Sequence, residues 1–156
     1  MSILGNRVVR VEDPRFLRGE GRYVENLDLE GALSVTFVRS PLAHARVNAV
    51  DASAAEALPN VRVFTGADVD AHPFGPPPHW HIAAGMERPL VARDVVRFAG
   101  DIVALVVSED RASGLDAAEL VLVDYDPLPA ALSIEEAVKD EVLLFPEVGS
   151  NVANRS

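Results

Sequence analysis

The chain has 156 residues, of which 49% are apolar, and it carries a formal net charge of −10. It contains no cysteine, which excludes disulfides, cysteine nucleophiles and iron–sulfur clusters held by its own thiolates. One domain is the natural expectation for this length, and no stretch reaches the run of about 18 apolar residues that a membrane helix requires.

The charge is unevenly distributed along the chain. Residues 1–50 carry seven Arg against six acidic residues, whereas residues 101–156 carry three basic residues against twelve acidic ones. A nucleic-acid-binding protein would show a basic patch, so we expect no nucleic-acid partner. No apolar signal segment follows Met1, and with the absence of cysteine this favours a cytoplasmic protein.

Residues 1–30 are rich in arginine and interrupted by proline and glycine, which predicts an extended arm without a helix. The guanidinium group of arginine presents paired N–H donors that bind carboxylates and phosphates well. The arm's arginines are therefore interpreted either as an interface to another domain or subunit, or as pairing on the chain's own surface. They are Arg7, Arg10, Arg15, Arg18 and Arg22.

Residues 32–39 alternate and are rich in β-branched side chains, which predicts a strand with Val35 and Phe37 on one face. Ser40 and Pro41 end that strand. Further strands are predicted at 44–50, 61–64 and 95–98, and Asp51 is expected to cap a short helix over 52–58.

Residues 72–89 form a proline-rich loop between these strands. Its His72, His79 and His81 are candidates for a metal site, although the segment has no nearby carboxylate before Glu87. Most simply it is a variable loop. As a third alternative, His79, Trp80 and His81 form part of a partner contact.

The second half begins with an apolar run at 102–107, which predicts a central strand buried on both faces. Ser108 is expected to cap a helix whose inner face carries Ala112, Leu115 and Ala118, and which Gly114 weakens by about 1 kcal/mol relative to Ala. A strand at 119–125 follows, and a capping box at 133–136 begins a last short helix. A right-handed crossover within one sheet would join the two strands. The predicted fold class is α+β (mixed α/β), with short helices packed on a single sheet.

Three constellations invite a catalytic interpretation, and each has a plainer one. Ser40, His44 and Asp51 occur in the order of a hydrolytic triad, but no nucleophile elbow surrounds Ser40. Asp124 and Asp126 share a strand face, but acid–base catalysis would require an enclosed pocket. Residues 19–21 lack the strand and helix that flank a dinucleotide-binding turn. We therefore assign no catalytic, cofactor-binding or metal-binding residue.

Several short segments nevertheless occur in a characteristic order. They are Glu12–Arg15, Gly19–Tyr23, Phe37–Pro41, Ala43–Arg46, Val96–Asp101, Asp116–Pro129 and Phe145–Ala153. In this order the chain resembles the N-terminal α/β-hammerhead domain of the molybdenum hydroxylase large subunit, in the xanthine dehydrogenase and aldehyde oxidase family, with the carbon monoxide dehydrogenase-like branch nearest. The resemblance implies a molybdopterin cofactor and a molybdenum-binding chain or domain, with iron–sulfur and flavin subunits receiving electrons. It also implies that the cofactor loops and the catalytic glutamate lie outside this domain.

The resulting expectation is a non-catalytic domain or a split or truncated subunit of a molybdopterin-dependent oxidoreductase that packs against the cofactor-binding part. Its predicted organisation is an arm at 1–30, a hammerhead domain at 31–140 and a tail at 141–156. The alternative is a free-standing protein-binding module that has lost the enzyme context.

Overall fold

The computed structural model describes residues 10–24, 27, 29–69, 71 and 82–154. Of the residues singled out from the sequence, Arg7, His72, His79, Trp80 and His81 lie outside these ranges. The chain divides into two compact units, Met1–Ala32 and Leu33–Ser156, and each is described by itself. The expected division at residues 30 and 141 stays a prediction.

The described residues of the first unit include the short helix α1 (Asp13–Leu17), where the sequence predicts no helix. Pro14 lies in the first turn, where its missing N–H would have no partner within the helix and its fixed φ suits helix initiation. The ring of Phe16 in this helix stacks on that of Tyr23, with the centroids 6.0 Å apart.

The second unit begins with a three-stranded antiparallel sheet, in the order β1 (Ser34–Arg39), β5 (Ile102–Ser108), β3 (Arg62–Thr65). Phe37 lies opposite Leu105 of β5, and Leu105 also lies opposite Phe64 of β3. The sequence places the 102–107 strand at the centre, and the structure confirms that position.

A second three-stranded sheet has the order β4 (Val95–Val96), β2 (Ala45–Asp51), β6 (Leu122–Pro127), again antiparallel. The structure thus has small sheets with short helices, as the fold class predicts, but its strands form two sheets where one was expected. The predicted crossover within one sheet is wrong, because β1 and β3 already occupy both edges of β5. The chain after β5 therefore pairs with β2, in the other sheet.

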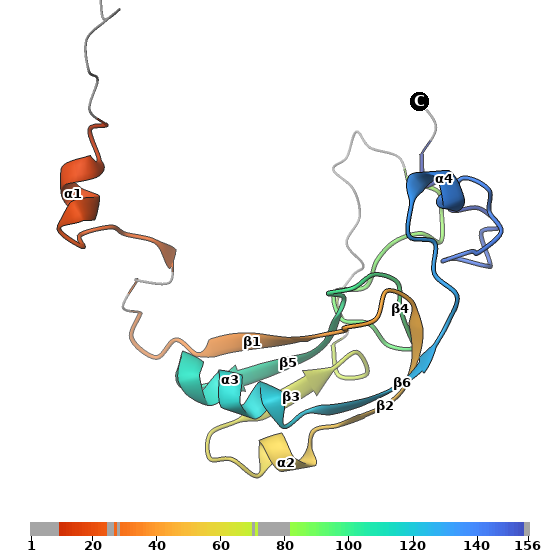
Figure 1. Ribbon diagram of the computed structural model, residues 1–156. Helices are drawn as coiled ribbons and strands as arrows, with labels where there is room; N and C mark the ends of the chain where they lie inside the picture. The colour runs from red at the N-terminus through yellow and green to blue at the C-terminus, as the bar shows by residue number, and fades with distance from the viewer. Residues whose placement is uncertain (1–9, 25–26, 28, 70, 72–81, 155–156) are drawn as a thin grey trace, which may run out of the picture. The chain divides into compact units, whose positions relative to one another are not determined.

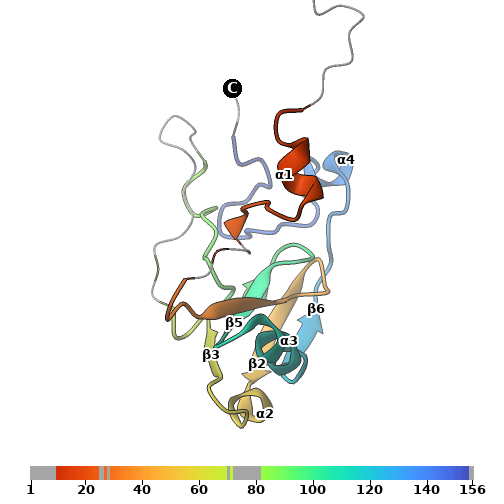
Figure 2. The same ribbon diagram turned by 90° about the vertical axis from the view of Figure 1, so that its left-hand side faces the viewer.

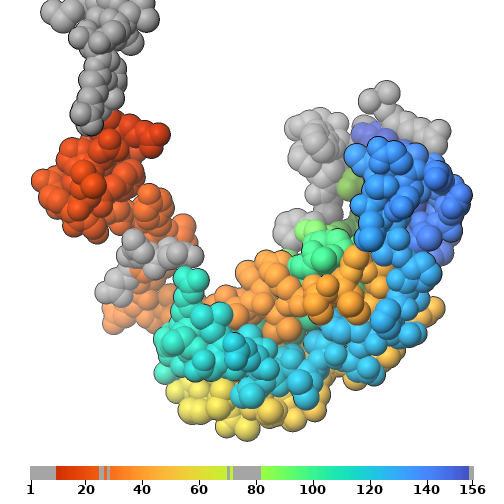
Figure 3. Space-filling model, viewed as in Figure 1, coloured from red at the N-terminus to blue at the C-terminus, as the bar shows by residue number. Residues whose placement is uncertain are grey.

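Helix α3 (Arg111–Glu119) packs on one face of the first sheet and beside α2 (Ser53–Glu56); Figures 2 and 3 show these elements together. Its buried residues are Gly114 and Ala117, whereas Leu115 is 50% exposed. The predicted inner face of Ala112, Leu115 and Ala118 is therefore wrong for Ala112 and Leu115. The small residues face the sheet and allow the helix to lie close to it.

The opposite face of the first sheet is apolar and lies open. Val35 is 50% exposed, Phe37 46% and Phe64 40%, and their register partners Leu105 and Val107 are half-buried. We call these five residues the apolar face. The prediction that β5 is buried on both faces is wrong, because α3 covers only one of them.

Buried polar groups hold the end of β1 to the start of β5 and also contact β6 of the second sheet. Ser40 donates its backbone N–H to the carbonyl oxygen of Asp101 at 2.8 Å, and Gly100 donates to that of Ser40 at 2.8 Å. Burial raises the pKa of the nearby Tyr125 hydroxyl, opposed by a hydrogen bond with Ser40 and reinforced by the charge of Asp101. Val38 and Val123 pack against the cores of both sheets. The sheets therefore form one body.

The end of the chain carries α4 (Ile134–Ala137). Ser133 accepts from the backbone N–H of Glu136 at 3.2 Å, which confirms the predicted capping residue. The Glu136 carboxylate accepts from Leu132 instead of closing the box on Ser133. No helix in the part of the chain that the structure describes is long and apolar enough to cross a membrane.

Candidate functional site

The residues in triad order do not form a triad. The Ser40 hydroxyl bonds both the carbonyl oxygen and the N–H of Leu42, each at 3.0 Å. His44 is hydrogen-bonded through Nδ1 to the carbonyl oxygen of Pro129, and Asp51 accepts from the Ser53 N–H at 2.9 Å. Each side chain is therefore engaged in holding backbone, and none activates another.

The pair of Asp124 and Asp126 is exposed on β6. Asp124 accepts a hydrogen bond of 3.3 Å from Asn48, across from a register shift in β2. Both carboxylates are exposed, so the plainer interpretation of a solvated strand end fits the geometry.

The described residues offer no cluster of side chains that would hold a metal ion directly. No three His, Asp or Glu side chains among them gather as metal ligands, and the sequence has no cysteine. We derive no catalytic step from this chain.

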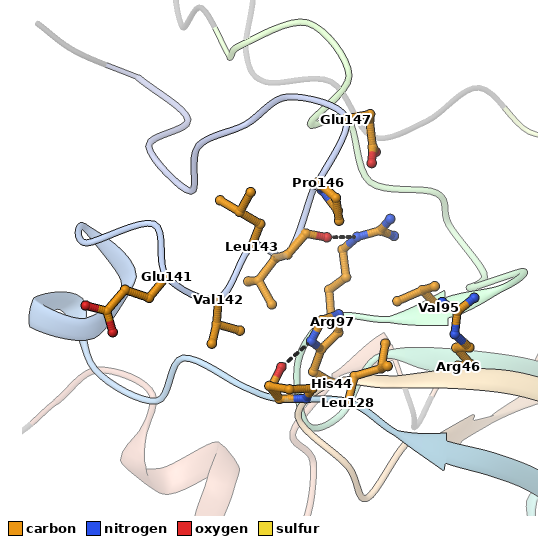
Figure 4. A pocket seen from close by; sticks show the side chains of 12 residues that line it. His44, Arg46, Val95, Arg97, Leu128, Glu141, Val142, Leu143, Pro146 and Glu147 are labelled. Carbon is orange, nitrogen blue, oxygen red and sulfur yellow. Dashed lines mark hydrogen bonds between the residues drawn. The ribbon is translucent and has the colours of Figure 1, made fainter.

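A pocket of about 480 Å³ lies between the second sheet and the segment 141–147. Its basic residues lie at strand ends: His44 just before β2, Arg46 within it, and Arg97 just after β4. Its acidic residues, Glu141 and Glu147, come from the segment opposite. We call this cavity the arginine pocket (Figure 4).

Asn151 fixes the segment that forms the far wall. Its amide donates to the carbonyl oxygens of Ala137 and Val142 at 3.1 and 2.7 Å, and its Oδ1 accepts from the Leu144 N–H at 2.9 Å. Asp140 accepts from the backbone N–H of Asn151 at 2.7 Å. A segment without regular secondary structure is thus held by side-chain bonds that replace a backbone ladder.

Arg97 spans the pocket from strand to wall. Its Nε donates to the carbonyl oxygen of Leu144 at 2.8 Å, and its guanidinium lies over the Phe145 ring, 4.3 Å from the centroid. Below it, the bond between His44 Nδ1 and Pro129 requires the proton to be on Nδ1, because a carbonyl oxygen only accepts. The pocket's basic side is therefore oriented by fixed contacts.

The arm's arginines make local contacts within the first unit. Arg15 pairs with Glu12 at 3.6 Å and Arg18 with Glu20 at 3.3 Å, while Arg10 and Arg22 are exposed. Exposed pairs of this kind contribute little to stability. Their role as an interface stays a prediction.

The sequence alone does not reveal the arginine pocket, although segments on both sides of it carry the family resemblance. His44 and Arg46 lie within one segment with a family resemblance, and Phe145 and Asn151 lie in another. The detectable signal was the polar Asn151 after an apolar stretch, but nothing local indicates that it folds 141–147 back over β2 and β4.

Comparison with known proteins gives a consistent result. Residues 18–129 match the family model described as aldehyde oxidase and xanthine dehydrogenase, a/b hammerhead domain. The chain is 37% identical to the nicotine 6-hydroxylase large subunit of Paenarthrobacter nicotinovorans, covering 99% of this chain and 19% of that protein. It is 40% identical to the carbon monoxide dehydrogenase large chain of Afipia carboxidovorans, covering 92% of this chain and 18% of that one.

Solved structures show the same similarity in three dimensions. Quinoline 2-oxidoreductase from Pseudomonas putida 86 superposes with a TM-score of 0.72 at 43% identity, over 90% of this chain and 18% of that one. The Cu,Mo-CO dehydrogenase superposes with a TM-score of 0.73 at 40% identity, over 92% and 18%. The chain therefore spans about a fifth of the length of these relatives.

Proposed function

Given that this chain belongs to the aldehyde oxidase and xanthine dehydrogenase a/b hammerhead family, we propose that it is a non-catalytic domain of a molybdopterin-dependent oxidoreductase. Its work is to pack against the part of the enzyme that binds the cofactor. Relatives with matching sequence are named as large chains and large subunits of dehydrogenases and hydroxylases, which supports an assembly of several chains.

The apolar face carries this proposal. An exposed sheet face with two phenylalanines flanking Leu105 is unusual for a surface in water, and contiguous patches of this kind mark interaction sites. Burying one such side chain contributes about 1.5–3 kcal/mol. Phe37 and Phe64 are therefore the expected anchors of the contact.

The arm supplies a second candidate contact. Arg10 and Arg22 are exposed, and arginines are enriched where protein surfaces meet. As part of the same proposal, Arg10, Arg15, Arg18 and Arg22 face another domain or subunit, and iron–sulfur and flavin subunits complete the electron path. In this proposal the cofactor is held outside this chain.

The test is to purify the chain with a molybdenum-binding chain encoded near its gene. We expect a stable complex, with aldehyde- or carbon monoxide-dependent dye reduction. Phe37→Asp should weaken the complex about tenfold or more, because it puts an unpaired charge into an apolar contact. The measurement is the dissociation constant by sedimentation or surface plasmon resonance.

Leu122→Asp is the matched control. Leu122 is 66% exposed and lies on β6, in the other sheet, so its substitution should leave the complex unchanged. Circular dichroism should show both variants folded. A monomer indifferent to the partner would overturn the proposal and favour a free-standing binding module. Equal weakening by both variants would show that the apolar face is not the contact.

A further inference from the structure

We infer that the arginine pocket binds a carboxylate, and that its occupant is the side chain of a Glu or Asp in the cofactor-binding part of the enzyme. The source of the carboxylate rests on the proposed function. The chemistry of the site rests on the pocket alone.

The first argument is the state of the two guanidinium groups. Among the described residues, Arg97 forms a hydrogen bond through Nε alone, to Leu144, and both of its amino groups remain available there. Arg46 is exposed, and within the described residues neither arginine forms an ion pair. Two cations share a cavity whose acidic residues do not reach them, which leaves a local demand for a negative charge.

The second argument is geometric. Arg46 lies opposite Val95 in the register of β2 and β4, and Arg97 follows Val95 by two residues. Arg97 lies just beyond the end of β4, and Val95, Arg46 and Arg97 all line the pocket, so both arginines lie on the same side of the sheet. The stacking of Arg97 on Phe145 holds one fork in place, and a fixed fork binds a carboxylate with less loss of entropy.

The third argument is the lining. Apolar side chains make up most of the remaining wall: Val95, Leu128, Pro129, Val142, Leu143 and Pro146. The volume of about 480 Å³ is within the range of small-ligand sites. A carboxylate on a short aliphatic side chain, flanked by apolar residues, would complement both the positive charge of the arginines and the apolar lining of the pocket.

The fourth argument distinguishes a carboxylate from a polyanion. Glu147 lies in the lining with the two arginines and offsets part of their positive charge without pairing with either, so a ligand with several negative charges would be repelled. Figure 4 shows the Glu141 carboxylate directed away from both arginines, on the outer side of the wall. One negative charge is what the interior can neutralise.

The test uses the whole chain labelled with ¹⁵N and two capped tripeptides, acetyl-Leu-Glu-Leu-amide and acetyl-Leu-Gln-Leu-amide. We expect the Glu peptide to shift the amide signals of Arg46, Arg97 and Leu144, and to bind about tenfold more tightly than the Gln peptide, as charge-assisted hydrogen bonds predict. Its binding should weaken as salt is raised. Equal binding of the two peptides would overturn the carboxylate site.

Arg46→Gln is the informative variant, because Arg97 also supports the wall. Arg46→Gln should remove the preference for the Glu peptide and leave binding of the Gln peptide unchanged. Arg111→Gln, at the exposed start of α3, is the matched control and should retain the preference. Loss of the preference in both variants would contradict the inference.

Two further arms identify the source. If free glutarate binds more tightly than the Glu peptide, the occupant is a small acid, and the assignment to a protein side chain fails. If the complex with the molybdenum-binding chain forms but Arg46→Gln does not weaken it, the inferred source is overturned while the proposed function stands. Absence of any complex overturns the proposed function and leaves the peptide result to decide the carboxylate site.

Discussion

Gly114 lies where α3 meets the first sheet, and the close contact there leaves no room for a side chain. A Cβ atom at this position would lie 2.6 Å from Ser108 Oγ and 2.7 Å from Thr36 Oγ1. Both oxygens belong to side chains on β5 and β1, and Ser108 is only 1% exposed. Glycine therefore allows a close approach of helix and sheet, which helix propensity alone does not reveal.

Gly114→Ala is accordingly expected to destabilise the chain by about 1–3 kcal/mol, because it overpacks a filled contact. Helix propensity taken alone predicts that the substitution raises the free energy of unfolding by about 1 kcal/mol. The sign of the measured change therefore distinguishes overpacking from propensity. Urea denaturation provides the free energy of unfolding.

The control for Gly114→Ala is Ala112→Gly, at an exposed position of the same helix. This substitution should lower stability by about 1 kcal/mol through propensity alone. A stabilised Gly114→Ala variant would contradict the close-packing argument.

The residue that caps the start of α3 is Asp110 and not the predicted Ser108. The Asp110 side chain accepts from the Ser113 N–H at 3.0 Å and from the Ser113 hydroxyl at 2.6 Å. Ser108 instead donates its hydroxyl to the carbonyl oxygen of Asp110 at 2.7 Å, from within the core. The hydrogen bonds from Ser113 lower the pKa of the Asp110 carboxyl, so folding favours its ionised form.

The stabilisation from ionised Asp110 should depend on pH with a definite sign. A lowered folded-state pKa means that the stabilisation is complete above the unfolded-state value of 3.8 and is lost as the pH falls through the lower folded-state value. The difference in free energy of unfolding between wild type and Asp110→Asn should therefore be constant near neutral pH and shrink toward zero in acid.

Asp116→Asn, in an exposed position of the same helix, serves as the control for the Asp110 experiment. It changes the same charge without removing a capping bond, so its effect should be smaller at neutral pH. An Asp110→Asn difference that grew as the pH fell would have the wrong sign for this cap.

Across the second unit, an apolar sheet face coexists with strong negative charge. The whole chain carries −10, which keeps copies apart at low ionic strength. The apolar face favours association once repulsion is screened. The Debye length falls from about 30 Å at 0.01 M salt to about 3 Å at 1 M.

The purified chain is therefore expected to self-associate as salt increases. Sedimentation velocity should show a larger average mass near 1 M NaCl than near 0.01 M, and the double substitution of Phe37 and Phe64 by Asp should abolish the increase. Leu122→Asp should not. Salt-dependent association that survives the double substitution would place the contact elsewhere.

The sequence alone determined the features that depend on neighbouring residues. Alternation in 32–39 revealed a strand and its two faces, the continuous apolar run revealed the central β5, and the Ser133 cap revealed α4. The ordered motifs revealed the family, because they mark turns and strand ends that the fold requires at fixed places. Each of these signals is local, and secondary structure responds first to local periodicity and capping.

The tertiary structure decided what depends on competition between distant segments. β6 pairs with β2 because β5 has no free edge. Gly114 of α3 faces the sheet because only a small residue fits against Thr36 and Ser108. The apolar face stays exposed because α3 covers the other face of that sheet. The arginine pocket forms because the hydrogen bonds of Asn151 hold the segment 141–147 against β2 and β4. Such outcomes depend on which surfaces are already occupied, and that information is spread over the whole chain.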